Sequence, residues 1–323
     1  MSDFYNVKLI INKELSLQRL DKVLVSRLES YSRTQIKTLI LNGNVIKNGA
    51  EIKDPSHITR ENENYSINLF INHKKKHQPE EINLNIIYED EDLIVINKQS
   101  NLVVHPAPGN ESGTLVNALM YYTNNQLSNL DNGTRPGIVH RLDKDTSGII
   151  VVAKNNNIHI DLAKQFKDHS ISRKYKAIVW GLPNSQTIEG HIDRNKKNRK
   201  KMSLNSKGLG KFSKTVIKLE KTFGIASLID CELHTGRTHQ IRVHLTSKNS
   251  PVVGDKVYGK SKINQFGKDK TTFNKFMILK NFERQALHAY HLAFDHPKSK
   301  KRMNFDVDLP EDFKNLLELL VKY

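Results

Sequence analysis

The chain has 323 residues, of which 37% are apolar, so it is long enough for a sizeable core and for more than one average domain. Lysine and arginine total 51 against 34 acidic residues, giving a formal net charge of +17 and a pI of about 9.7. This excess favours a polyanionic partner, although the codon bias of an AT-rich genome would raise the lysine content without any partner.

The single cysteine, Cys231, excludes a disulfide within the chain. No run of about eighteen apolar residues indicates a membrane span, and residues 1–11 lack the basic and apolar segments of a signal peptide. We therefore expect a cytoplasmic protein.

Residues 1–72 are expected to form a small separate unit. Apolar residues recur on one helical face between residues 18 and 29, and Ser32 with Gln35 is typical of a capping box that starts a second helix. Alternating apolar and polar residues over 65–71 predict a half-buried strand. A polar, basic stretch ending in proline then indicates a linker over 73–82.

Residues 83–323 are predicted to form a larger α+β domain with a mixed sheet. A hairpin is predicted over 85–97, helices over 115–122 and 159–167, and strands over 175–180, 215–221 and 226–233. Strands outnumber helices and lack a strict β-α-β alternation, which favours this class over a doubly wound sheet. Residues 260–281 are rich in lysine without a clear period, so we expect a surface insertion there.

The segment Gly-Ile-Val-His-Arg-Leu-Asp-Lys-Asp-Thr-Ser-Gly, residues 137–148, carries most of the functional information. It predicts a short strand, a sharp polar loop and a second strand over 149–153, with Asp143 in the loop close to Arg141. Such a carboxylate suits a nucleophile or a general base, whereas the simpler alternative is an aspartate that stabilises a turn. The pattern disfavours a calcium loop, since Lys154 stands where a bidentate glutamate is required.

The string His-Arg-Leu-Asp-Lys-Asp-Thr-Ser-Gly resembles the catalytic motif of the RluA family of RNA pseudouridine synthases. The resemblance implies that Asp143 is catalytic. Residues 173–177, Arg-Lys-Tyr-Lys-Ala, are similar to a second motif of the family, which implies that Tyr175 packs on the target base. Residues 236–244 are similar to a third motif, which implies that Arg237 pairs with Asp143 and keeps it ionised.

The resemblance extends over nearly the whole chain. Residues 102–106, 251–255 and 285–289 are similar to the RluD-like branch in particular, which implies the pseudouridine synthase fold and uridines of large-subunit (23S) ribosomal RNA as substrate. The N-terminal unit resembles the S4 RNA-binding domain. The face that this second resemblance assigns to RNA comprises Arg19, Ser32, Arg33, Gln35 and Lys37.

Further RNA contacts are expected beside the catalytic motif and in a basic loop. The resemblance assigns His140 and Arg141 to the RNA, with Arg141 filling the gap that the extruded nucleotide leaves. Six of the eight residues over 194–201 are basic, which fits contact with the RNA backbone, although such runs are often only solvated. The basic residues assigned to the RNA there are Arg194, Lys196, Lys197, Arg199 and Lys200.

Neither a metal nor a cofactor is expected. The histidines around residue 239 do not have the spacing of a zinc site, and no second cysteine is present. Isomerisation of uridine needs no redox step: the carboxylate either attacks the ribose C1′ or removes the C2′ proton, and both routes remain open. The expected partners are ribosomal RNA and a pre-ribosomal particle, bound by a monomer, and the alternative function is that of a non-catalytic S4-type RNA-binding protein.

Overall fold

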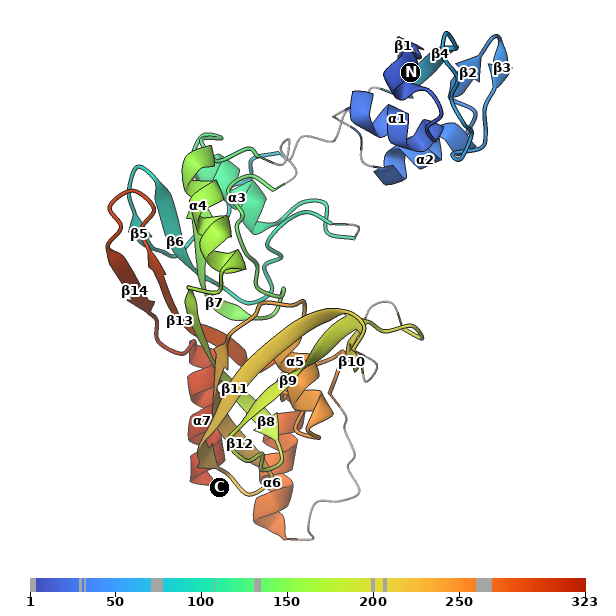
Figure 1. The fold of residues 1–323 in the computed structure, drawn as a ribbon. Coiled ribbons are helices and arrows are strands. Elements are labelled where there is room, and N and C mark those ends of the chain that lie inside the picture. Colours follow the sequence, from blue (N-terminus) through green and yellow to red (C-terminus); the bar gives the residue numbers. More distant parts are fainter. Residues whose placement is uncertain are drawn as a thin grey trace. The chain divides into compact units, whose positions relative to one another are not determined.

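The chain forms two compact units, residues 1–76 and 77–323, which are described separately (Figure 1). The computed structural model describes residues 4–28, 31, 33–70, 78–107, 109–130, 135–198, 201–205, 208–259 and 269–323. Half of the predicted linker, residues 73–77, lies outside these ranges. Within them, no helix combines the length and apolar character that crossing a membrane requires.

The first unit is a small antiparallel sheet with two helices. Its strands are β1 (Phe4–Ile10), β2 (Val45–Lys47), β3 (Ala50–Glu51) and β4 (Asn64–Phe70), in the order β1-β4-β2-β3. A short 3-10 helix, η1 (Lys13–Leu15), precedes the helices α1 (Leu20–Arg27) and α2 (Arg33–Leu41). The apolar faces of both helices enter one core with the sheet, so the two predicted helices and the predicted strand are confirmed.

The second unit is built on a mixed sheet of ten strands in the described part of the chain. Its path runs β10-β9-β11-β12-β8-β13-β7-β6-β5, and β14 pairs with β13. β13 is parallel to β7 and antiparallel to β8, which makes the sheet mixed, as predicted. The strands are β5 (Ile86–Glu89), β6 (Leu93–Lys98), β7 (Ser147–Ala153), β8 (Ser172–Trp180), β9 (Gln186–Arg194), β10 (Met202–Asn205), β11 (Lys211–Thr222), β12 (Ala226–Leu233), β13 (Leu287–Asp295) and β14 (Arg302–Asp306).

Two helices cover opposite faces of strands β6 and β7. Side chains alternate between the faces of a strand, so Ile150 and Val152 pack with α3 (Leu115–Tyr122). Ile149 and Val151 instead pack with α4 (Asn156–Lys167). Because both faces are covered, β7 is apolar almost throughout and is buried along its whole length.

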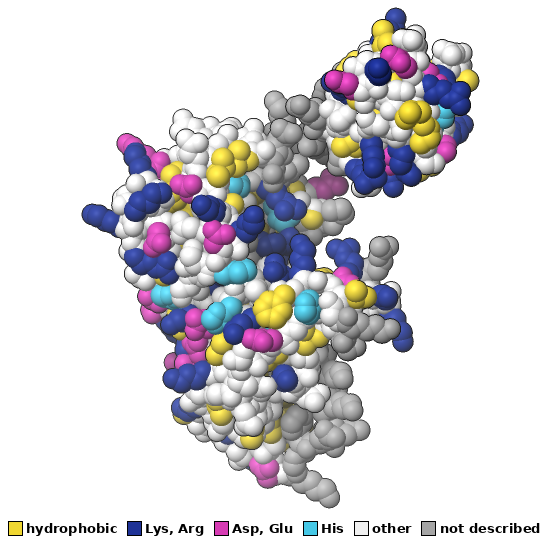
Figure 2. All heavy atoms as spheres, viewed as in Figure 1, with side chains coloured by type: hydrophobic (Ala, Val, Ile, Leu, Met, Phe, Trp, Pro, Cys, Tyr) yellow, Lys and Arg dark blue, Asp and Glu magenta, His cyan; other side chains and the backbone are white. Residues whose placement is uncertain are grey.

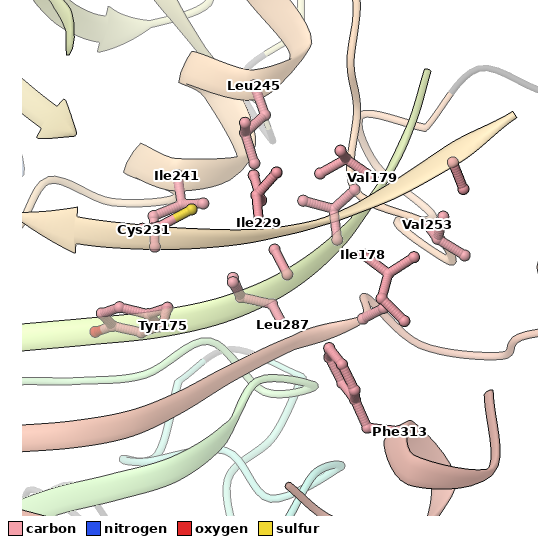
Figure 3. Packing of buried hydrophobic residues seen from close by; sticks show 14 of the residues in the cluster. Tyr175, Ile178, Val179, Ile229, Cys231, Ile241, Leu245, Val253, Leu287 and Phe313 are labelled. Carbon is pink, nitrogen blue, oxygen red and sulfur yellow. The ribbon is translucent and has the colours of Figure 1, made fainter. Parts of the chain in front are cut away.

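The other half of the sheet packs against the helices α5 (Gln240–Ser247), α6 (Lys270–Lys280) and α7 (Glu311–Lys322). Figure 3 shows Ile241 and Leu245 on one side of the strands and Phe313 on the other. Tyr175 lies at the edge of this core.

Two sequence predictions were wrong in this unit. The strand expected before Asp143 is reduced to an isolated bridge between Ile138 and Val152, since the chain turns away at once. The expected surface insertion over 260–281 contains helix α6, which Asp269 caps and which buries Phe276 and Leu279; the part over 260–268 lies outside the described residues.

Candidate active site

A cleft of about 370 Å³ lies in the second unit where four segments meet. Residues 139–143, the end of α4, the start of β8 and residues 236–242 line it. On the face shown in Figure 2, Lys and Arg side chains gather around a hollow in this unit. The cleft brings together Asp143, Tyr175 and Arg237, which are far apart in the sequence.

The loop that carries Asp143 is fastened on both sides. Before it, the Nε2 atom of His140 accepts a hydrogen bond from the Val151 backbone N–H at 3.0 Å, and its ring stacks on Phe166. Burial lowers the pKa of His140 to about 3, so the ring is neutral and free to accept this bond. Leu142 is buried in the core next to Asp143. The carboxylate is therefore held on a fixed backbone.

Buried cations hold the far side of the same loop. The Nζ atom of Lys98 donates to the carbonyl oxygens of Leu102 and Lys144, and burial lowers its pKa to about 7. An Nη1 atom of Arg284 donates to the Asp145 carbonyl at 3.1 Å. These bonds satisfy loop carbonyls that would otherwise be buried without partners.

Gly148 allows the loop to enter β7 against the neighbouring strand. Its φ is +116°, and a Cβ there would lie 2.1 Å from the backbone oxygen of Ala289 on β13. Only glycine fits this close approach. The glycine at the end of the motif thus has a packing role and not a chemical one.

Asp143 forms its ion pair with Arg242. An Nη1 atom of Arg242 donates to Oδ2 of Asp143 at 2.7 Å. The arginine is buried on the first turn of α5, while Asp143 is partly exposed towards the cleft. A short charge-assisted bond of this kind fixes the direction of the carboxylate and balances its charge.

The guanidinium of Arg242 is held in turn by Asp255. Its Nε atom donates to Oδ2 at 2.7 Å and Nη2 donates to Oδ1 at 2.9 Å, a bidentate pair. Burial lowers the pKa of Arg242, but the bonds to Asp255 and the charge of Asp143 outweigh burial and raise that pKa above its usual value. Burial raises the pKa of Asp255, but the hydrogen bonds from Arg242 and its charge outweigh burial and lower that pKa below its usual value. The backbone N–H groups of Tyr258 and Val257 also donate to Asp255 and add to this lowering.

The expected pair between Arg237 and Asp143 was wrong. Arg237 precedes α5, and its Nε atom donates to the backbone oxygen of Phe212 at 2.8 Å. Arg242 instead lies on α5, which directs its side chain into the core beside the loop. Both arginines belong to the same short motif, and their spacing alone does not separate the two roles.

His239 is a further cleft residue next to the carboxylate. Its Nε2 atom lies 3.8 Å from Oδ1 of Asp143, and its Nδ1 atom lies 2.9 Å from the Tyr258 hydroxyl. Burial lowers the pKa of His239, against the opposing charge of Asp143. The sequence motifs assign His239 no part in the reaction.

Tyr175 lines the cleft from β8 and is otherwise buried, with its pKa raised to about 12 by burial. It belongs to the same buried core cluster as Leu142, Cys231 and Ile241, and Cys231 lies opposite it on the neighbouring strand β12. The tyrosine therefore combines a core position with a surface that a bound base can contact.

The other described residues that are expected to contact RNA are exposed or partly exposed. Arg141 is exposed at the cleft. In the first unit, the buried Asp21 pairs with Arg19 and Arg33, and Lys37 is exposed one turn after Arg33 on α2. The side chain of Gln35 is half-buried on the same helix.

In the predicted basic loop, Arg194 ends β9 and Lys196 and Lys197 are exposed after it. Ser32, Arg199 and Lys200 lie outside the described residues. None of the described loop residues lines the cleft.

One group of side chains in the described part of the chain is close enough to share a metal ion: Asp90, Asp92 and His296. It lies away from the cleft, and both ring nitrogens of His296 already have partners. Its Nε2 atom lies 3.0 Å from Asp90, and Nδ1 accepts from two backbone N–H groups. These hydrogen bonds explain why the side chains lie close together, as part of the structure of the loops.

Comparison with known proteins identifies the family. Residues 92–247 match the family described as RNA pseudouridylate synthase, and residues 18–64 match the S4 domain. The ribosomal large subunit pseudouridine synthase D of Zymomonas mobilis is 42% identical over 316 residues, covering 96% of each chain. The chain belongs to the RNA pseudouridine synthase family.

Other relatives agree with this assignment. The synthase D of Buchnera aphidicola strain Bp is 44% identical over 306 residues, covering 94% of this chain and 93% of that one. The solved structure of human RNA pseudouridylate synthase domain containing 4 has a TM-score of 0.54 at 22% identity, covering 73% of this chain and 93% of that one. The structural match supports the fold alone. As an RNA pseudouridine synthase, the chain is an isomerase, and its S4 unit is an RNA-binding domain.

Proposed function

We propose that this synthase converts uridines of large-subunit ribosomal RNA to pseudouridine, with Asp143 as the catalytic carboxylate. The single observation that carries the choice of Asp143 is its position in the cleft, where it is partly exposed and bonded to the buried Arg242. The choice of RNA follows from relatives named ribosomal large subunit pseudouridine synthase D at about 40% identity over nearly the whole chain.

The residues of the cleft divide the proposed reaction between them. Asp143 either attacks the ribose C1′ or removes the C2′ proton, and in both routes the uracil leaves N1, turns and rejoins through C5. Arg242 keeps the carboxylate oriented, since its bonds to Asp255 leave the Nη1 atom free to donate to Asp143. Tyr175 offers the detached uracil a flat face, and such stacking contributes roughly 1 to 3 kcal/mol.

The remaining contacts concern the rest of the RNA. In the proposal, Arg141 and His140 flank the extruded nucleotide, Arg237 contacts RNA at the rim of the cleft, and the basic S4 face binds the phosphate backbone. A monomer acting on ribosomal RNA or on a pre-ribosomal particle would meet this substrate in the cytoplasm.

Tritium release from RNA labelled at uracil C5 tests the proposal. Large-subunit ribosomal RNA transcribed without modifications should release tritium with the wild-type enzyme and none with Asp143→Asn, while both proteins bind it equally. Lys314→Met, on the exposed face of α7, is the matched control and should behave as wild type. Equal release by the wild type and Asp143→Asn would refute the role of Asp143. Release from small-subunit RNA alone would refute the substrate.

A further inference from the structure

Arg173 is a buried arginine that has no role in the reaction proposed above. It lies on β8 two residues before Tyr175, so both side chains are on the same face of the strand, and both line the cleft. Only 7% of its surface is exposed. Because a guanidinium stays charged in a protein, its burial costs free energy unless an anion or several acceptors balance it.

In the described part of the chain, no carboxylate oxygen lies within 4.0 Å of a guanidinium nitrogen of Arg173, so Arg173 forms no ion pair there. Its buried Nε atom has no hydrogen-bond partner. The guanidinium lies 5.5 Å from the ring centre of Phe166, a cation–π contact that attracts the charge but accepts none of its in-plane hydrogen bonds. The donors of Arg173 are therefore left for a group that the protein does not supply.

The backbone next to Arg173 leaves room for its guanidinium. A Cβ at Gly236 would lie 2.6 Å from the Nη1 atom of Arg173. The glycine of the third motif thus permits the arginine to lie against the segment that leads to α5. A side chain at residue 236 would fill this space and displace the guanidinium of Arg173 from the lining of the cleft.

Two cations, Lys167 and Arg237, line the same cleft as Arg173, and His169 lies there with them. Burial, and then the charge of Arg237, lowers the pKa of Arg173; burial, and then the charges of Arg173 and Arg237, lowers that of His169. The cleft carboxylate, Asp143, is already bonded to Arg242.

We propose that Arg173 binds a phosphate of the RNA backbone next to the uridine that enters the cleft. A phosphodiester brings a full negative charge and two acceptor oxygens, which match the paired N–H groups of a guanidinium. A uracil carbonyl would also accept from Arg173 but would leave the neighbouring positive charges unbalanced, so the phosphate is the better fit. The proposal rests on the proposed action on ribosomal RNA and adds a residue that positions the substrate.

The test uses the full-length enzyme, Arg173→Met and the charge-matched control Lys314→Met. The RNA is a ribosomal fragment that the wild type modifies, synthesised with one neutral methylphosphonate at each phosphate around the modified uridine in turn. With unmodified RNA, Arg173→Met should bind about 10- to 100-fold more weakly than wild type, as expected for lost charge-assisted bonds. The slope of log Kd against log salt should fall in magnitude by about one, more than for the control.

The methylphosphonate series separates a phosphate contact from other roles. One substitution should weaken wild-type binding about tenfold. The same substitution should leave Arg173→Met almost unchanged, because the contact is already lost. Arg173→Lys, which keeps the charge, should retain part of this coupling and replaces the methionine variant if that variant fails to fold.

Equal binding by wild type and Arg173→Met would overturn the proposal. A second outcome would also overturn it: Arg173→Met binds more weakly, but each methylphosphonate weakens the binding of Arg173→Met and of wild type to the same extent. That result is expected if Arg173 contacts uracil. If the wild type modifies no ribosomal fragment, the proposed substrate fails instead, and the two failures are thereby distinguished.

Discussion

Asp143 and Asp255 bind the same guanidinium, that of Arg242, from different directions. Asp255 takes the Nε and Nη2 atoms of this buried arginine, and Asp143 takes Nη1 at the cleft. A planar guanidinium fixed at two positions has little freedom left at the third. The direction of the carboxylate in the cleft is therefore set by a second, fully buried carboxylate that does not line the cleft.

This arrangement predicts different effects for the two arginines of the third motif. Arg242→Lys keeps the charge but cannot bridge both aspartates, so we expect kcat to fall on the order of 100-fold or more, as for the loss of an electrostatic contact in an active site. Arg237→Lys keeps a cation at the rim, and we expect a change of no more than about tenfold, mostly in KM. Single-turnover kinetics on ribosomal RNA measure both.

Circular dichroism and urea unfolding of both variants serve as the control for folding. Lysine is chosen over an apolar residue because an unpaired buried Asp255 would cost about 3 to 5 kcal/mol of stability. A larger kcat loss in Arg237→Lys than in Arg242→Lys would contradict the pairing seen in the structure.

A second prediction concerns Asp255 as a positioning residue. Asp255→Asn keeps the shape of the side chain but loses the charge that holds Arg242, so we expect kcat to fall about 10- to 100-fold with KM little changed. Asp230→Asn is the matched control, because Asp230 is also bonded to a cation, but that cation, Lys176, does not line the cleft. A change in KM alone would indicate that Asp255 acts on binding and not on the carboxylate.

The fold was largely predictable where apolar periodicity was strong. The period of α3 and the unbroken apolar run of β7 identify both elements, since each buries its side chains in a continuous core. Helix α6 was missed because its apolar residues do not lie on one face: Phe276 and Leu279 are buried, whereas Phe273 and Met277 are exposed. They therefore give no visible period.

The candidate site was predictable in its motifs but not in its pairings. Asp143 and Tyr175 follow from short motifs, whereas the choice of Arg242 over Arg237 depends on where α5 begins. Asp255 was not singled out, because its partner lies on a different element and no local pattern links the two. Contacts between elements of this kind require the tertiary structure.

A third prediction separates the two roles of Tyr175. Tyr175→Phe keeps the flat ring, so we expect kcat/KM within a few-fold of wild type. Tyr175→Leu keeps much of the apolar volume but removes the flat face, and we expect a loss of about 1 to 3 kcal/mol in transition-state stabilisation.

Thermal unfolding of the Tyr175 variants provides the check on packing. Leucine at this position in the core should lower stability only modestly, because apolar volume is largely conserved. Equal kcat/KM for the leucine and phenylalanine variants would show that the ring contributes to the core alone.

A fourth prediction concerns the pH dependence of stability, to which two fully buried histidines contribute. His244 lies between the hydroxyls of Ser213 and Thr215, and His288 is bonded to Ser147. Burial lowers the pKa of each to about 4, from an ordinary value of 6.5. The folded pKa lies below the unfolded one, so the unfolded chain takes up protons first as the pH falls. The stability due to these histidines is complete above about pH 6.5 and is lost progressively between pH 6.5 and 4.

Urea unfolding at pH 7.5 and pH 5.5 measures this loss. Each histidine should contribute on the order of 1 kcal/mol to the decrease in the free energy of unfolding between these two values. His244→Gln keeps hydrogen-bonding groups but does not titrate, so its decrease should be smaller by about that amount. His234→Gln replaces an exposed histidine and should show the wild-type decrease. An identical decrease in His244→Gln and wild type would mean that His244 is not held neutral in the folded protein.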